Sequence, residues 1–143
     1  MRFVVESSLA QEAAFAAVAD FARFDEWDPA VANSRLVAGT ALAPGSLYQL
    51  TAPRWLGRVV LEYELLAIEP PHYATYRGGS QRVSSTDTMR VSPSPEGSRV
   101  AIESQLSTTG RARWLMPLIS ALVWVVGRSL SLPALKRRLN PKR

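Results

Sequence analysis

The 143-residue chain contains no cysteine and only one histidine, His72. Without cysteine the chain has no disulfide framework, no thiolate nucleophile and no cysteine-based zinc site. A single histidine also excludes a metal centre with three histidine ligands. The composition therefore excludes much metal and nucleophilic chemistry, and we expect neither a metal site nor a cofactor.

Acidic residues are missing from the last part of the chain. The segment from Gly110 to Arg143 carries eight basic residues and no acidic one, whereas the segment from Met1 to Thr109 carries nine basic and twelve acidic residues. Such asymmetry is typical of a solubilising tail, or of a segment close to nucleic acid or to an anionic membrane. We expect no nucleic-acid partner, because the chain has no recognition motif and no strand on which aromatic and basic residues interleave.

A long hydrophobic run is also lacking. The most apolar stretch, Trp114 to Gly127, is interrupted by Pro117 and Ser120 and is shorter than the roughly 20 residues that span a bilayer. Glu6 interrupts the N-terminal apolar residues, so the start does not resemble a signal peptide. We therefore expect a cytoplasmic protein, with contact to a membrane surface as a further alternative.

The residues that are present are those of a globular domain. Hydrophobic residues make up 47% of the chain and charged residues 20%, which excludes disordered and low-complexity classes. At this length one domain is expected. We assign it to residues 1–139, followed by a short basic tail at residues 140–143.

The first forty residues predict a strand and two helices. Arg2 to Ser7 is typical of a strand, and Ser8-Leu9-Ala10-Gln11 has the Ser-x-x-Gln form of a capping box. Helical spacing predicts a helix from Leu9 to Asp20. A second, short helix from Phe21 to Trp27 would end at Asp28-Pro29, because a residue before proline disfavours the helical conformation.

The middle of the chain predicts a sheet. Alternating residues, separated by turn signals that include Gly78-Gly79 and Pro93 to Gly97, indicate six more strands. These are Asn33–Ala38, Leu47–Ala52, Arg58–Ile68, Tyr73–Arg77, Val83–Val91 and Arg99–Ser107. Because short turns join them, they should pair mostly antiparallel, with one face covered and the other wet.

The last element is predicted to be a long helix, which completes an α+β domain with helices covering one face of a curved antiparallel sheet. Pro117 fits the first turn of this helix. Pro133 should kink the helix, because it cannot donate to the Ser129 carbonyl.

Apolar residues surround this helix between Leu118 and Val126, whereas a surface helix should show a polar face. Val123 and Trp124 therefore need cover. A wide stripe facing the sheet together with a homodimer contact would provide it, and so would lipid at a membrane surface.

The order of elements, together with several short motifs, resembles the START-like superfamily, the polyketide cyclase/dehydrase and lipid-transport group also known as SRPBCC. The matching segments are Val18-Ala19-Asp20-Phe21, Glu26-Trp27-Asp28-Pro29, Glu69-Pro70-Pro71, Gly97-Ser98-Arg99-Val100 and Pro117. The resemblance implies a helix-grip fold, in which a seven-stranded curved antiparallel sheet wraps around a long C-terminal helix. The fold also has two short N-terminal helices. It also implies a cavity for a hydrophobic or amphipathic small molecule.

Several residues are candidates for that cavity. The expected apolar wall is Leu61, Leu65, Met89, Val91, Ile102, Leu106, Leu118, Leu122 and Val125. Tyr63 shares a face with Leu61 and Leu65, and its hydroxyl would need a partner when buried. Trp27 either plugs one end of the interior or contacts the ligand. The candidate ligand-binding residues are thus Trp27, Leu61, Tyr63, Leu65, Asp87, Met89, Leu118 and Leu122.

Asp87 is a weak candidate for catalysis. On its strand it points to the same face as Met89 and Val91. If that face is inward and deep, burial raises the pKa of Asp87 and makes it a candidate general acid or base. The alternative is a position at a strand end in water. Tyr73 and Tyr76 have opposite parity, so at most one of them should point inward. His72 is expected on the surface.

Two functions follow from these residues. The first is noncatalytic binding or carriage of a lipid, quinone or polyketide-like compound. The second is a cyclase, aromatase or dehydratase that uses Asp87 and a tyrosine for proton transfer. A third hypothesis is a peripheral membrane or protein-interaction module that uses the C-terminal helix. Trp55 and Leu56 are expected at the tip of a loop. Three positions are open to them: the rim of the cavity, a membrane surface, or the loop's own strands, onto which the loop would fold back.

Overall fold

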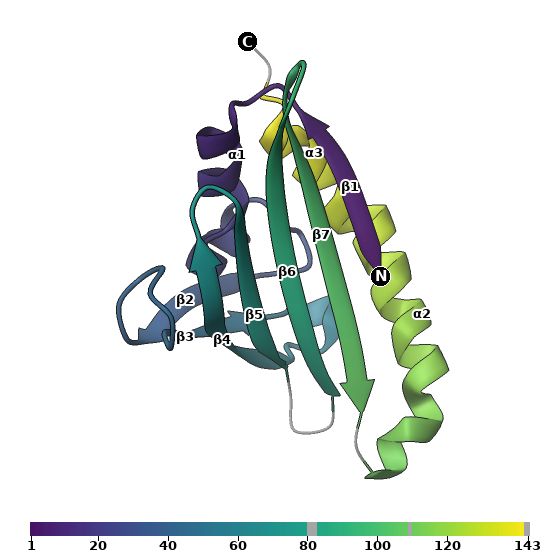
Figure 1. The fold of residues 1–143 in the computed structure, drawn as a ribbon. Helices are drawn as coiled ribbons and strands as arrows, with labels where there is room; N and C mark the ends of the chain where they lie inside the picture. Colours follow the sequence, from purple (N-terminus) through teal and green to yellow (C-terminus); the bar gives the residue numbers. More distant parts are fainter. Residues whose placement is uncertain (80–82, 109, 142–143) are drawn as a thin grey trace.

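The computed structural model describes residues 1–79, 83–108 and 110–141. Residues 142 and 143 of the predicted basic tail lie outside the described part. Seven strands form one antiparallel sheet in the order β1-β7-β6-β5-β4-β3-β2 (Figure 1). Their bounds are β1 Arg2–Ser7, β2 Asn33–Ala38, β3 Leu47–Thr51, β4 Val60–Glu69, β5 Tyr73–Gly79, β6 Val83–Ser94 and β7 Gly97–Thr108. The predicted strands and their antiparallel pairing are confirmed.

One turn prediction was wrong, and the turn predicted at Pro93 to Gly97 is confirmed but narrower, at Pro95 and Glu96. Gly78 and Gly79 belong to β5, where Gly78 pairs with both Tyr63 and Ser85 across the neighbouring strands. A Cβ atom on Gly78 would lie 1.8 Å from the backbone oxygen of Glu62, so only glycine fits there. Likewise β6 continues to Ser94, because a tight turn joins it to Gly97 on β7.

The N-terminal helices match the predicted positions but not the predicted cap. The α-helix α1 covers Gln11–Val18 and the 3₁₀ helix η1 covers Phe21–Glu26. The N-cap of α1 is Ala10, without a side-chain hydrogen bond, so the capping box is not formed. The side chain of Gln11 instead donates to the Val91 carbonyl on β6 over 2.9 Å, which ties α1 to the sheet.

The C-terminal region consists of four consecutive helical segments. The 3₁₀ helix η3 covers Gly110–Leu115, the α-helix α2 covers Met116–Val126, the π-helix η4 covers Gly127–Ser131 and the α-helix α3 covers Leu132–Leu139. The predicted effect of Pro133 appears as this π-helical turn, in which the Leu132 N–H donates to the Gly127 carbonyl. A wide turn suits this position because the nitrogen of Pro133 carries no hydrogen and cannot donate the hydrogen bond of a regular α-helix.

The two halves of the long helix differ in burial. Residues Ala134, Leu135 and Leu139 of α3 are buried in the core, and the backbone oxygen of Leu139 accepts a hydrogen bond of 2.6 Å from the Ser7 hydroxyl on β1. Along α2, in contrast, Leu118, Leu122 and Trp124 are exposed. Figure 1 shows α2 extending beside β7 and past the N-terminal end of β1. The stripe of α2 that faces the sheet is therefore narrower than expected, because only Leu122, Val123 and Val126 among its described residues line the cavity between the helix and the sheet.

The length of this helix also changes how the apolar run is interpreted. Pro117–Leu139 forms one helix of 23 residues whose most apolar window has a mean hydropathy of 1.7, so it is long and apolar enough to cross a membrane by length and composition alone. The core helix of a globular protein passes the same test, but only 17% of this window is buried. The sequence run Trp114 to Gly127 underestimated this element because the helix continues through α3.

Candidate functional site

A cavity of about 340 Å³ lies between the concave face of the sheet and the C-terminal helix. The sheet contributes Leu61 from β4, Asp87 and Met89 from β6, and Ile102 and Ser104 from β7. The helix contributes Leu122, Val123, Val126, Gly127, Ser131, Leu132 and Leu135. Seventeen of the twenty-one lining residues are apolar or glycine, so the cavity is mainly apolar with a few polar positions.

Aromatic side chains close one end of the cavity. Phe24 lies between Phe21 and Trp27, with ring centroids 4.4 Å and 4.9 Å away respectively, and all three rings line the space. Phe21 also stacks on Tyr76 of β5 at 3.7 Å. This aromatic end is fixed by packing because Phe21 and Tyr76 are fully buried.

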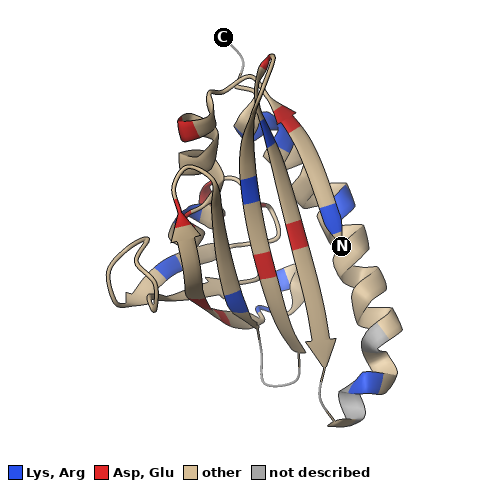
Figure 2. Ribbon diagram, viewed as in Figure 1, with Lys and Arg blue, Asp and Glu red and all other residues tan. Residues whose placement is uncertain are grey.

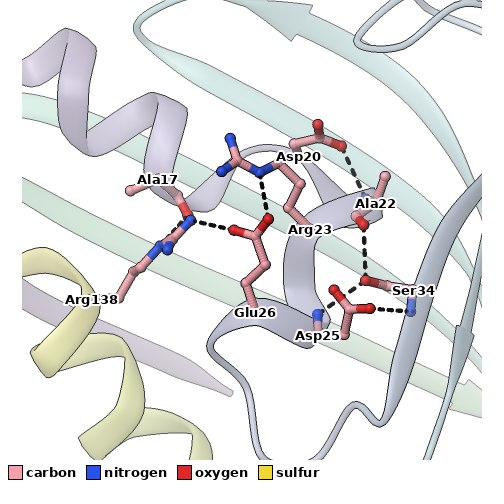
Figure 3. A network of polar contacts seen from close by, with 8 residues as sticks. All are labelled: Ala17, Asp20, Ala22, Arg23, Asp25, Glu26, Ser34 and Arg138. Atoms are coloured by element: carbon pink, nitrogen blue, oxygen red, sulfur yellow. Dashed lines mark hydrogen bonds and ion pairs between the residues drawn. The ribbon is translucent and has the colours of Figure 1, made fainter.

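Hydrogen bonds hold η1, which carries two of these rings, in place. Figure 3 shows Glu26 between Arg23 and Arg138, with both ion pairs at 3.0 Å, so that η1 is linked to α3. On the other side of η1, the Ser34 hydroxyl of β2 donates to the Ala22 carbonyl over 3.0 Å and accepts from the Asp25 N–H. The aromatic end is thereby connected to both the helix and the sheet edge.

Asp87 lies on the inner face of the sheet and lines the cavity. The Ser85 hydroxyl donates to its Oδ1 atom over 2.8 Å, and Ser104 is its direct partner across the β6–β7 pair. Burial raises the pKa of Asp87 above its ordinary value, although the hydroxyls of Ser104, Ser85 and Tyr63 oppose this rise. The inward alternative for Asp87 is therefore the one that the structure shows.

Tyr63 approaches this carboxyl from β4. Burial, and after it the charge of Asp87, raises the pKa of the Tyr63 phenol above its ordinary value, so the phenol stays protonated. The absence of a side chain at Gly78, which pairs with Tyr63 and with Ser85, leaves room between β4 and β6 for this contact. The inner side of the sheet thus carries one polar cluster among apolar residues. It consists of the Asp87 carboxyl and the hydroxyls of Tyr63, Ser85 and Ser104.

A second carboxyl lines the cavity near the aromatic end. The Oδ1 atom of Asp28 accepts hydrogen bonds from the Ser131 hydroxyl over 2.7 Å and from the Ala30 N–H over 2.9 Å. Burial raises the pKa of Asp28 as well. The sequence indicated only that Asp28-Pro29 ends a helix. No pattern linked Asp28 to Ser131, because they lie 103 residues apart.

The predicted site residues fall into three groups. Trp27, Leu61, Asp87, Met89 and Leu122 all line the cavity. Tyr63 and Leu65 are buried in the adjoining core rather than in the lining. Leu118 is 69% exposed and lines no described cavity, so its expected inward position was wrong. Val125, also exposed, shares this error.

The remaining aromatic and histidine positions are also resolved. Tyr76 is the inward member of its pair, and its hydroxyl donates to the Ala19 carbonyl over 2.7 Å. Tyr73 lies under the guanidinium of Arg90 at 5.4 Å. His72 is exposed, as expected. In the loop, Trp55 is exposed whereas Leu56 lines the cavity rim. Within residues 1–79, 83–108 and 110–141, no group of three metal-ligating side chains is placed to hold an ion.

A groove of about 610 Å³ adjoins the cavity. It lies between β7 and α2, and it shares Met1, Ser104 and Val123 with the cavity. Shared walls make the two spaces neighbours, with the groove running beside α2. Trp124 lines only the groove.

An antiparallel sheet that curves around a long C-terminal helix, with an apolar cavity between them, defines the helix-grip class of fold. The chain belongs to the polyketide cyclase/dehydrase and lipid transport family, whose sequence model matches residues 1–139. A search of the curated proteins found no match.

Solved structures show the same fold. Protein MLL2253 from Mesorhizobium loti is 19% identical, with a TM-score of 0.70 over 97% of this chain and 95% of that one. Ara h 8.0201 is 14% identical, with a TM-score of 0.69 over 97% and 95%. The di-domain ARO/CYC protein StfQ from the steffimycin biosynthetic pathway is 14% identical, with a TM-score of 0.68 over 97% of this chain and 49% of that chain.

The burial of Asp87 predicts a pH-dependent stability. Because its pKa is higher in the folded than in the unfolded chain, the folded state binds the extra proton, and this contribution to stability is lost as the pH rises above about 4 through the folded pKa. Asp87→Asn, which stays neutral, should lose less unfolding free energy between about pH 4 and pH 7 than the wild type does. Urea unfolding at both pH values measures this.

The matched control is Glu64→Gln, which removes a carboxyl from an exposed position on β4. Its stability should follow the wild-type curve between the two pH values. Parallel curves for the wild type and Asp87→Asn would show that the carboxyl is solvated in the folded protein, contrary to its position in the cavity wall.

Proposed function

We propose that this protein binds a hydrophobic or amphipathic small molecule, such as a lipid, quinone or polyketide-like compound, between the sheet and the C-terminal helix. The observation that carries the proposal is the apolar cavity of about 340 Å³ with a few polar positions. Pockets of this size and character are typical of small-molecule sites. Membership of the polyketide cyclase/dehydrase and lipid transport family supports the same ligand class.

A cavity-filling substitution tests this proposal. The neutral fluorescent probe N-phenyl-1-naphthylamine should bind the wild type and raise its melting temperature by mass action. Ala52→Phe, at the cavity wall, should weaken probe binding by about tenfold or more, because the new ring occupies ligand space. Fluorescence titration measures both affinities.

Ala38→Phe is the matched control, because Ala38 is exposed on β2 and outside the cavity lining. It should bind the probe as the wild type does. A folded wild type that neither binds the probe nor shows a melting shift with it would refute the binding proposal.

The inward position of Asp87 favours a second candidate, an enzyme of the cyclase, aromatase or dehydratase type. In this proposal the carboxyl of Asp87, which lines the cavity, transfers a proton, and the protonated phenol of Tyr63 positions that carboxyl from the adjoining core. Asp87→Asn would then abolish turnover of a polyketide-like substrate while binding persists. Undiminished turnover in that variant would refute the assignment.

We further propose that the exposed face of η3 and α2 contacts an anionic membrane surface, from which the ligand enters. This face, here called the α2 apolar face, consists of Trp114, Leu115, Leu118, Leu122, Trp124 and Val125, all of them exposed. Figure 2 shows α2 to be largely free of charge, and the basic residues Arg113 and Arg128 flank the face. Apolar residues bordered by basic ones are typical of helices that lie in the membrane interface.

Contact with the surface is favoured over crossing of the bilayer. The α3 half of the long helix is held in the core by Leu135 and Leu139, so the free part runs only from Gly110 to Val126. That part is shorter than the roughly 20 residues that a span requires. A second copy of the chain is the other occupant that would cover such a face.

Vesicle flotation tests the membrane contact. The full chain should float with vesicles of phosphatidylglycerol and phosphatidylcholine in equal parts, and less with phosphatidylcholine alone. The double variant Leu115→Ser/Leu118→Ser should partition about tenfold less, because each leucine loses its burial in lipid.

Leu47→Ser is the control, because Leu47 is exposed on β3, far along the sheet from α2. It should float as the wild type does. A wild type that stays in solution and elutes as a dimer, which Leu115→Ser/Leu118→Ser converts to a monomer, would assign the face to a second copy instead.

A further inference from the structure

The cavity contains two carboxyl groups and no cationic side chain. Asp28 and Asp87 carry the only charged side chains in its lining, and all twenty-one lining residues lie in the described part of the chain. The Met1 amino group donates to the Ser104 carbonyl at the exposed mouth, 2.9 Å away. This acidic interior contrasts with the chain as a whole, which has a net charge of +5.

The two carboxyls stand on different walls. Asp87 projects from β6 on the sheet side, whereas Asp28 follows η1 and contacts Ser131 on the helix side. Each is surrounded by apolar lining, with Met89 and Leu61 on the sheet and Trp27 and Leu132 near the other wall. A ligand that fills the space between the two walls therefore contacts both of the walls that carry these carboxyls.

The serine hydroxyls around the carboxyls are already used as donors. Ser131 donates to Asp28 over 2.7 Å, and Ser85 donates to Asp87 over 2.8 Å. The polar positions consequently offer a ligand mainly carboxyl oxygens, which accept hydrogen bonds and, when ionised, carry negative charge. An anion here would meet charge repulsion in an apolar environment, where screening by water is weak.

We propose that the cavity selects amphiphiles whose polar group donates a hydrogen bond to Asp28 or Asp87, such as an alcohol, a phenol or a protonated amine, and rejects those that end in a carboxylate. This inference rests on the proposed function, because it specifies the ligand class of the same cavity. It excludes free fatty acids and other carboxylate ligands from the preferred set.

Three naphthalenes of similar size test the inference, namely 2-naphthol, 2-naphthylmethylamine and 2-naphthoate. Each competes with N-phenyl-1-naphthylamine for the wild-type protein at neutral pH. The phenol and the amine should displace the probe at concentrations at least about tenfold lower than the carboxylate does, given the strength of charge interactions at low dielectric. A protein with an N-terminal extension, which moves the Met1 ammonium away from the mouth, should show the same order.

Charge-neutral variants then identify the source of the preference. In Asp87→Asn and in Asp28→Asn the preference for amine over carboxylate should fall severalfold, while 2-naphthol binding changes little because an amide still accepts a hydrogen bond. Glu64→Gln, which removes an equal charge from the surface, should keep the wild-type preference. Two single variants are used, so that misfolding of one, seen by circular dichroism, leaves the other to decide.

The outcomes separate this inference from the proposed function. If the probe binds and the carboxylate displaces it as well as the amine does, or if no naphthalene displaces it, the inference is overturned while hydrophobic binding stands. An unchanged preference in the folded aspartate variants also overturns it. If the probe itself does not bind the folded protein, the proposed function fails.

Discussion

The packing of α3 against the sheet is the constraint on which the site depends. Leu135 and Leu139 are buried, and the Ser7 hydroxyl fixes the last turn of α3 to β1. The π-helical turn at residues 127–131 connects this anchored end to α2, most of which is exposed. Gly127 lets this turn pack closely against β1, since a Cβ atom there would lie only 3.1 Å from the ring of Phe3.

The cavity results from this arrangement and from the aromatic end. The stack of Phe21 on Tyr76 fills the interior between η1 and β5, and the ion pairs of Glu26 hold η1 in that position. Beyond the aromatic rings, Met89 from β6 and Ile102 from β7 line the space without filling it. The interior space therefore remains next to α2, where the helix contributes Leu122 and Val126 but little contact with the sheet.

The position of the cavity next to an exposed helix connects the two proposed properties of the protein. Val123 lines both the cavity and the groove, and Trp124 of the α2 apolar face lines the groove. An apolar ligand would then pass from a membrane to the cavity without crossing water, while Asp28 and Asp87 would discriminate by its polar group.

The sequence by itself determined the elements and their faces. Alternation placed Tyr63 and Leu65 inward, and the order of elements along the chain and the final helix followed from local spacing, because these patterns depend on neighbouring residues. Only the tertiary structure decided the depth of Asp87, the pairing of Asp28 with Ser131 and the outward direction of Leu118. These depend on contacts between residues far apart in the chain and on how closely a helix approaches the sheet, and a periodic pattern carries neither.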